Sequence, residues 1–117
     1  MKILIAASEI APLAQTGGLA DVMRSLPIAL QEKGVDVALI MPKYRMVKID
    51  GDPLGDIQIP VEEKIVSGRL QQTFLPGTRI PVFLIEQDHY FDRDQLYTEK
   101  GRDYADNLER FTFFCRA

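Results

Sequence analysis

Residues 2–41 read KILIAASEIAPLAQTGGLADVMRSLPIALQEKGVDVALIM, and this stretch predicts the fold of the chain. Its first part, residues 2–8, contains a continuous apolar run without alternation, which is typical of a strand covered on both faces in a parallel sheet. From Leu19 to about Lys33, apolar residues recur at three- and four-residue steps, which predicts a helix. Residues 35–41 form a second apolar run. We therefore expect a right-handed strand–helix–strand unit.

The predicted helix has one apolar stripe and one internal proline. Gly34 supplies its C-terminal stop. Pro27 removes a backbone hydrogen bond at a cost of about 3 kcal/mol unless the fold compensates, so we expect the helix to bend near Ser25. The stripe consists of Leu19, Val22, Met23, Leu26, Ala29 and Leu30.

The composition indicates one soluble globular domain. The 117 residues are 46% hydrophobic and 26% charged, and 14 basic against 17 acidic residues give a net charge of −3 without a long run of either sign. This argues against nucleic acid or an anionic membrane as a partner. A single cysteine excludes an intramolecular disulfide, and no Cys and His residues stand at ligand spacing, so we expect no metal and a cytoplasmic protein.

The middle of the chain predicts a loop followed by a hairpin. Residues 42–56 carry glycines and prolines among charges, which is typical of a long irregular loop. Two strand-like runs follow at 57–66 and 69–75, and Ser67-Gly68 between them predicts an antiparallel hairpin. Pro60 makes the first of these an edge strand.

The last part of the chain predicts a strand and a helix. Residues 80–85 are an apolar run that we expect to return to the parallel sheet. From about Arg102, apolar residues again recur at helical steps, and the sequence reaches Ala117 with no glycine or proline stop, which favours a longer protein. The stripe of this helix consists of Tyr104, Leu108, Phe111 and Cys115.

Several residues are expected to have structural roles only. Met23 and Phe111 belong to helix stripes and should lie in the core. Cys115 should be a buried, inert thiol. His89, beside two aromatic residues, is expected to be a packed, hydrogen-bonded histidine and not a catalytic base.

The turn Thr16-Gly17-Gly18 lies between the first strand and the helix. Such a turn presents unpaired N–H groups at the positive end of the helix dipole, where an anion is favoured. Neither a dinucleotide fingerprint nor a P-loop is present, so a turn that only shapes the connection remains an alternative. The helix dipole alone is enough to explain Asp21 in the first helical turn, and Glu9 either caps the turn or lines a cleft.

The wider sequence resembles the bacterial glycogen synthases and plant starch synthases. The N-terminal motif of that family is matched by Ser8-Glu9, Pro12, Thr16-Gly17-Gly18-Leu19-Ala20-Asp21-Val22, Leu26-Pro27 and Ala29-Leu30. Further matches are Met41-Pro42-Tyr44, His89-Tyr90-Phe91-Asp92-Arg93, Leu96-Tyr97 and Asp103-Tyr104-Asp106-Asn107-Glu109-Arg110-Phe111. The resemblance therefore spans essentially the whole chain.

This resemblance implies a GT-B glycosyltransferase with two Rossmann-like domains, of which residues 1–117 are part of the N-terminal catalytic domain. The expected fold is α/β, a Rossmann-like parallel sheet with flanking helices and an inserted β-hairpin. Such enzymes transfer glucose from ADP-glucose to the non-reducing end of an α-1,4-glucan with retention, and no cofactor is implied. The residues implied in substrate binding are Glu9, Gln15, Thr16, Gly17, Gly18, Asp21 and Tyr97.

The resemblance also implies that the catalytic residues and most of the nucleotide site belong to the C-terminal domain. No catalytic residue is therefore expected within this segment, which alone should be inactive. Whether the donor carries ADP or UDP stays open. Asp106, Asn107 and Arg110 are expected to order the segment beneath the site.

Gln15 departs from the family motif, which usually has lysine at this place. An amide donates hydrogen bonds but brings no charge, so we expect weaker donor binding or slower transfer than in a lysine-bearing relative. A second interpretation is a non-catalytic glucan- or sugar-nucleotide-binding module derived from the same family. A third is a different sugar-nucleotide transferase of the same architecture.

Overall fold

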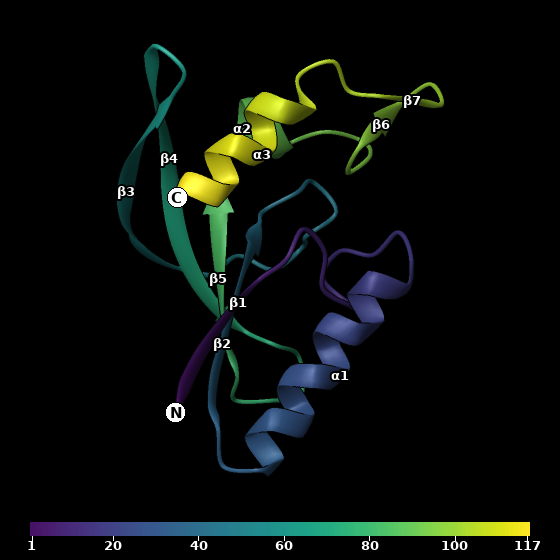
Figure 1. The fold of residues 1–117 in the computed structure, drawn as a ribbon, viewed down its shortest axis with the longest axis vertical. Coiled ribbons are helices and arrows are strands. Elements are labelled where there is room, and N and C mark those ends of the chain that lie inside the picture. Colours follow the sequence, from purple (N-terminus) through teal and green to yellow (C-terminus); the bar gives the residue numbers. More distant parts are fainter.

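The computed structural model describes residues 1–117 as an α/β fold with a five-stranded mixed sheet in the order β1-β2-β5-β4-β3 (Figure 1). The predicted fold class is confirmed. No helix is long and apolar enough to cross a bilayer. The elements are β1 (Lys2–Ala6), α1 (Gly18–Glu32), β2 (Asp36–Pro42), β3 (Asp52–Val61), β4 (Lys64–Phe74), β5 (Pro81–Glu86), α2 (Asp88–Phe91), β6 (Thr98–Glu99), β7 (Arg102–Asp103) and α3 (Asn107–Arg116).

The predicted strand–helix–strand unit is present. β1 pairs in parallel with β2, and β2 pairs in parallel with β5, so the predicted return to the parallel sheet is also confirmed. The central strands bury Leu39, Met41, Val82 and Leu84 completely. The carboxyl ends of these parallel strands meet at one edge of the sheet, where loops that carry functional groups gather.

Helix α1 is uninterrupted, and the residues that it buries against the sheet differ from the predicted apolar stripe. It continues through Pro27 to Glu32, so the proline does not break it. Ala20 and Pro27 are buried, and Met23 packs against the core as predicted. The larger Leu19, Val22 and Leu26 are 48%, 53% and 42% exposed. They stand one residue earlier than the buried line, which is about 100° around a helix of 3.6 residues per turn.

The hairpin is confirmed, but its turn is not at Ser67-Gly68. β3 already begins at Asp52, within the stretch predicted as a loop, and the turn lies at Glu62-Glu63, where Glu62 has a φ of 56°. Gly68 lies within β4, where an added Cβ would stand 2.9 Å from the main-chain oxygen of Glu86. The glycine therefore serves close packing and not a turn. β3 with Pro60 is an edge strand, as predicted.

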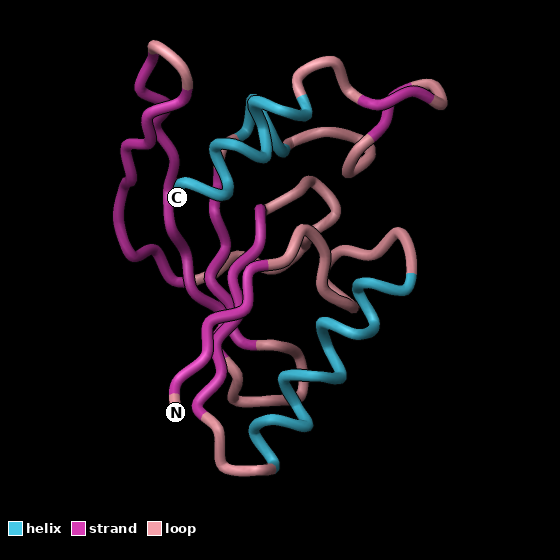
Figure 2. Tube along the Cα trace, in the orientation of Figure 1, coloured by secondary structure: helices cyan, strands magenta, loops and turns pink.

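The last helix starts later and buries a different line than predicted. Arg102–Asp103 form β7, which pairs with β6, and α3 begins only at Asn107. Arg110 and Phe113 are buried, whereas Leu108 is 81% exposed and Cys115 is exposed, so the expected buried thiol was wrong. Phe111 packs against the core as predicted. Figure 2 shows α3 beside the β3–β4 hairpin, at the opposite end of the fold from α1.

Candidate functional site

The glycine turn lies between the end of β1 and the start of α1. After Ala6 the chain forms a loop that reaches Gly17, the N-cap residue of α1. This places the turn at the carboxyl edge of the parallel strands and at the positive end of the helix dipole. Gly17 and Gly18 are both exposed.

The carboxylate of Glu9 binds the turn through hydrogen bonds. Glu9 is only 3% exposed, and its carboxylate accepts hydrogen bonds from the N–H groups of Thr16 and Gly17, both at 3.2 Å. The hydroxyl of Thr16 donates to the other carboxylate oxygen at 2.7 Å. The expectation that all N–H groups of the turn are unpaired is therefore wrong for Thr16 and Gly17. The first N–H groups of α1, at Gly18 and Leu19, have no partner within the helix.

Tyr97 joins this network from a distant part of the sequence. Its hydroxyl donates to Glu9 at 2.7 Å and lies 2.7 Å from the hydroxyl of Ser8. Burial and the hydrogen bond to Glu9 raise the pKa of Tyr97 to about 12. Burial raises the pKa of Glu9, but hydrogen bonds from Tyr97, Thr16 and Gly17 outweigh that effect and hold its pKa below the ordinary value. Glu9 is therefore a buried carboxylate stabilised by neutral donors.

Gln15 and Asp21 close the exposed side of the turn. The amide nitrogen of Gln15 donates to Asp21 at 2.9 Å and to the carbonyl oxygen of Gly17 at 3.3 Å. All three residues are exposed. The amide thus links the turn to the first turn of α1, and it brings no positive charge.

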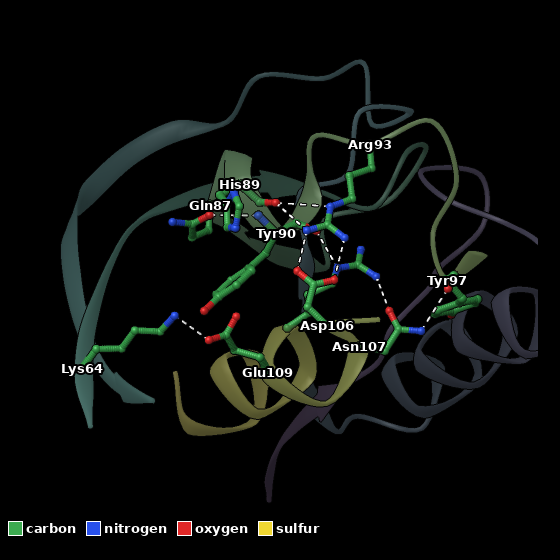
Figure 3. Close-up of polar contacts among 10 residues, drawn as sticks. Lys64, Gln87, His89, Tyr90, Arg93, Tyr97, Asp106, Asn107 and Glu109 are labelled. Atoms are coloured by element: carbon green, nitrogen blue, oxygen red, sulfur yellow. Dashed lines mark hydrogen bonds and ion pairs between the residues drawn. The ribbon is translucent and has the colours of Figure 1, made fainter. Parts of the chain in front are cut away.

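The loop that carries Tyr97 is fixed by an ion pair. Arg93 donates to both carboxylate oxygens of Asp106, at 2.7 and 2.6 Å, and to the carbonyl oxygen of His89 (Figure 3). Arg93 holds the pKa of Asp106 below its usual range. His89 itself is exposed, so its expected packed position was wrong, although its ring lies 5.6 Å from that of Tyr90.

The structure brings all the predicted binding residues together in one place. Six of them are linked by the hydrogen bonds described above, and Gly18 adjoins them as the first residue of α1. Ser8 belongs to the same network but was assigned no role from the sequence, although its position directly before Glu9 was a signal. Asn107 and Arg110 support the loop of Tyr97 as expected, since Asn107 donates to the carbonyl oxygen of Tyr97 at 2.9 Å.

The residues of the turn, Gln15 to Gly18, are exposed at the surface. A hollow of about 760 Å³ lies at the opposite, amino-terminal edge of the parallel strands and is lined by Leu4, Gly34 and Phe83 among others. No three His, Cys, Asp or Glu side chains lie close enough to hold a metal ion. Any ligand at the turn would need a second wall from outside these residues.

Comparison with known proteins gives a consistent result. The model of the starch synthase catalytic domain family matches residues 2–117. The chain is 49% identical to a glycogen synthase of Syntrophotalea carbinolica and 44% identical to one of Moorella thermoacetica, over 99% and 100% of its length. It covers only 24% and 23% of those relatives, so it spans about a quarter of their length.

A solved structure matches as well. The catalytic domain of starch synthase IV from Arabidopsis thaliana, bound to ADP and acarbose, superposes with a TM-score of 0.80 at 32% sequence identity. The match covers 98% of this chain and 23% of the plant chain.

Proposed function

This chain belongs to the starch synthase catalytic domain family. We propose that it is the N-terminal part of a cytoplasmic glucan synthase. The complete enzyme transfers glucose from ADP-glucose to the non-reducing end of an α-1,4-glucan with retention at the anomeric carbon. The relatives named glycogen synthase and the ADP bound to the plant relative support this proposal. The active site forms only when the rest of the enzyme supplies its second wall.

One observation carries the proposal, the presence of two glycines that the fold itself does not require. Gly17 has an extended backbone with a φ of −163°, which any residue adopts, and Gly18 begins an ordinary helix. An added Cβ at either position would meet nothing within 4 Å. Packing and backbone geometry thus leave both glycines unexplained, whereas a ligand that approaches the main chain closely explains them.

The electrostatics of the turn define what this segment contributes. Glucosyl transfer develops negative charge on the departing ADP phosphate, and preorganised N–H donors stabilise such charge. Because Glu9 already occupies the N–H groups of Thr16 and Gly17, the donors left for the phosphate are those of Gly18 and Leu19. The nearby negative charge of Glu9 means that the remaining part of the enzyme must add cations to the site.

The test is Gly18→Ala in the full-length enzyme. We expect an unchanged or higher Tm, because alanine is favoured over glycine in a helix by about 0.5–1 kcal/mol. We also expect kcat/KM for ADP-glucose to fall about tenfold, which corresponds to about 1.4 kcal/mol of lost transition-state stabilisation. Ser25→Ala, an exposed position on the same helix, is the control and should leave kcat/KM unchanged. Full activity of Gly18→Ala would contradict the proposal.

A second candidate function is a non-catalytic module that binds glucan or sugar nucleotide. The observation in its favour is the uncharged Gln15, whose amide is bonded to Asp21. Incubation of the full-length protein with ADP-glucose and glycogen separates the two functions. A synthase releases ADP in step with glucan elongation, whereas a binding module retains glycogen and releases none.

A further inference from the structure

Arg110 is a buried cation without a carboxylate partner. The residue lies in α3 and is 0% exposed. Its Nε donates to the carbonyl oxygen of Tyr90 at 2.6 Å and its Nη1 to the amide oxygen of Asn107 at 2.7 Å, while Nη2 has no partner. The guanidinium lies 4.8 Å from the centre of the Tyr104 ring and 5.2 Å from that of Phe111. Burial lowers its pKa.

Such an arrangement is costly for stability alone. Desolvation of a charge is repaid poorly by neutral acceptors, and a leucine or methionine would pack against the same aromatic rings without that penalty. What an apolar residue could not do is donate to the carbonyl oxygen of Tyr90 and to the side chain of Asn107, and Asn107 in turn donates to Tyr97. The hydrogen bond that Asn107 donates is therefore the contact through which Arg110 can affect the candidate site.

Asn107 connects Arg110 to Tyr97. Its amide oxygen accepts from Arg110. Its amide nitrogen donates to the carbonyl oxygen of Tyr97 at 2.9 Å (Figure 3). The amide is thus fixed in orientation by one bond and fixes the main chain of Tyr97 by the other. The ring of Tyr97 packs on that of Phe111 in the same helix, with centroids 5.9 Å apart.

Tyr97 in turn acts on the glycine turn through Glu9. Its hydroxyl is occupied by Glu9 and Ser8, and Glu9 binds the N–H groups of Thr16 and Gly17. A continuous path of hydrogen bonds therefore runs from α3 to the start of α1, between residues that are far apart in the sequence.

We propose that Asn107 and Arg110 are positioning residues that fix the glycine turn through Tyr97 and Glu9. The inference rests on the proposed function, because it assigns these residues to the turn that faces the donor phosphate. Loss of the path leaves the turn in place but less rigid, so that its N–H donors are less well preorganised for the transition state.

Asn107→Asp tests the path while keeping Arg110 paired. The carboxylate still accepts from Arg110, now with a charge, so the core is preserved or strengthened. A carboxylate oxygen replaces the amide N–H that faced the carbonyl oxygen of Tyr97, so that hydrogen bond gives way to a repulsive contact between two oxygens. The bond from the N–H of Tyr104 to the same carbonyl oxygen remains. Tyr97→Phe removes the next link, the hydroxyl, and keeps the ring in its place.

Two measurements on the full-length protein are needed. Amide hydrogen exchange of the turn, residues 15–18, reports whether the turn has become less rigid. Steady-state kinetics with ADP-glucose and glycogen reports whether the turn contributes to the reaction. For both variants we expect about tenfold faster exchange of the turn. We also expect kcat to fall about tenfold with a smaller change in KM. The double variant should lose no more than the worse single one, since both interrupt one path.

Matched controls separate positioning from general destabilisation. Tyr90→Phe removes the hydroxyl of another buried tyrosine, one that faces Glu109, and Gln31→Glu makes the same change from amide to carboxylate at an exposed site. Both should leave exchange of the turn and kcat unchanged.

The outcomes distinguish this inference from the proposed function. Unchanged exchange of the turn in Asn107→Asp and Tyr97→Phe overturns the inference, whether or not the protein is an active synthase. Faster exchange with unchanged kcat supports the path but shows that the turn does not act in the reaction, which overturns the proposed site. Faster exchange together with lower kcat supports both.

Discussion

Replacement of Glu9 by glutamine tests whether a buried charge holds the glycine turn. The two side chains have the same shape, so the substitution removes the charge and one acceptor oxygen without leaving a cavity. The carboxylate accepts from two N–H groups at 3.2 Å and from the hydroxyls of Thr16 and Tyr97 at 2.7 Å, and it is 3% exposed. Solvent therefore does little to screen these bonds.

The expected loss follows from the hydrogen bonds. A hydrogen bond to a charged group contributes about 1.5–3 kcal/mol and one between neutral groups about 0.5–1.5 kcal/mol, so each hydroxyl bond should weaken by about 1 kcal/mol. The amide nitrogen of glutamine cannot accept, so the hydroxyls of Thr16 and Tyr97 must reverse or lose their bond. We expect Glu9→Gln to lower the free energy of unfolding by about 2–3 kcal/mol near neutral pH.

The pH dependence gives the sharper test. The pKa of Glu9 is lowered in the folded protein, so its contribution is fully present above the unfolded pKa of about 4.3 and is lost as pH falls through the folded pKa. Denaturant unfolding of the full-length protein and of Glu9→Gln measures the difference across pH. The difference should be constant above about pH 5 and shrink below about pH 4.3. A difference that stays the same down to about pH 3 would refute the reasoning.

Two further predictions concern Gln15 and Gly68. Gln15→Lys places a cation beside Asp21 at the turn, so kcat/KM of the full-length enzyme for ADP-glucose should rise, most clearly at low salt; no change, or a fall, contradicts the role assigned to Gln15. Gly68→Ala should lower the free energy of unfolding by about 1–3 kcal/mol, because its Cβ would stand 2.9 Å from the oxygen of Glu86 and 3.0 Å from Phe113. An unchanged Tm for this variant would contradict the close packing.

The parts of the fold that follow from local patterns were predictable. Continuous apolar runs and a helical period are properties of neighbouring residues, so the unit of β1, α1 and β2 could be predicted. Gly68 could not, because the reason for a glycine there is a strand and a helix that pack on it from elsewhere in the chain. The pair β6–β7 was missed although its signal is local. Lys100 and Gly101 have φ values of 52° and 77°, as in the two-residue hairpin turns that favour glycine.

The candidate site was predictable to a similar degree. The turn from Thr16 to Gly18 stands out because glycines separate a strand from a helix, and the family resemblance added Tyr97. The hydrogen bond between Tyr97 and Glu9 could not be predicted from the sequence, because it joins residues 88 positions apart. The sequence left two roles open for Glu9, capping the turn or lining a cleft, because a carboxylate before a turn does not reveal where it points. The structure shows that it caps the turn.

The central position of β5 has a consequence for the order in which the chain folds. Residues 2–42 and residues 52–74 each form a unit from neighbouring segments, and β5 alone joins them, parallel to β2 and antiparallel to β4. During synthesis from the N-terminus both units emerge before β5 does. Until residues 81–86 leave the ribosome, the inner edges of β2 and β4 stay unpaired, which is the period when the nascent chain is most open to chaperones and to aggregation.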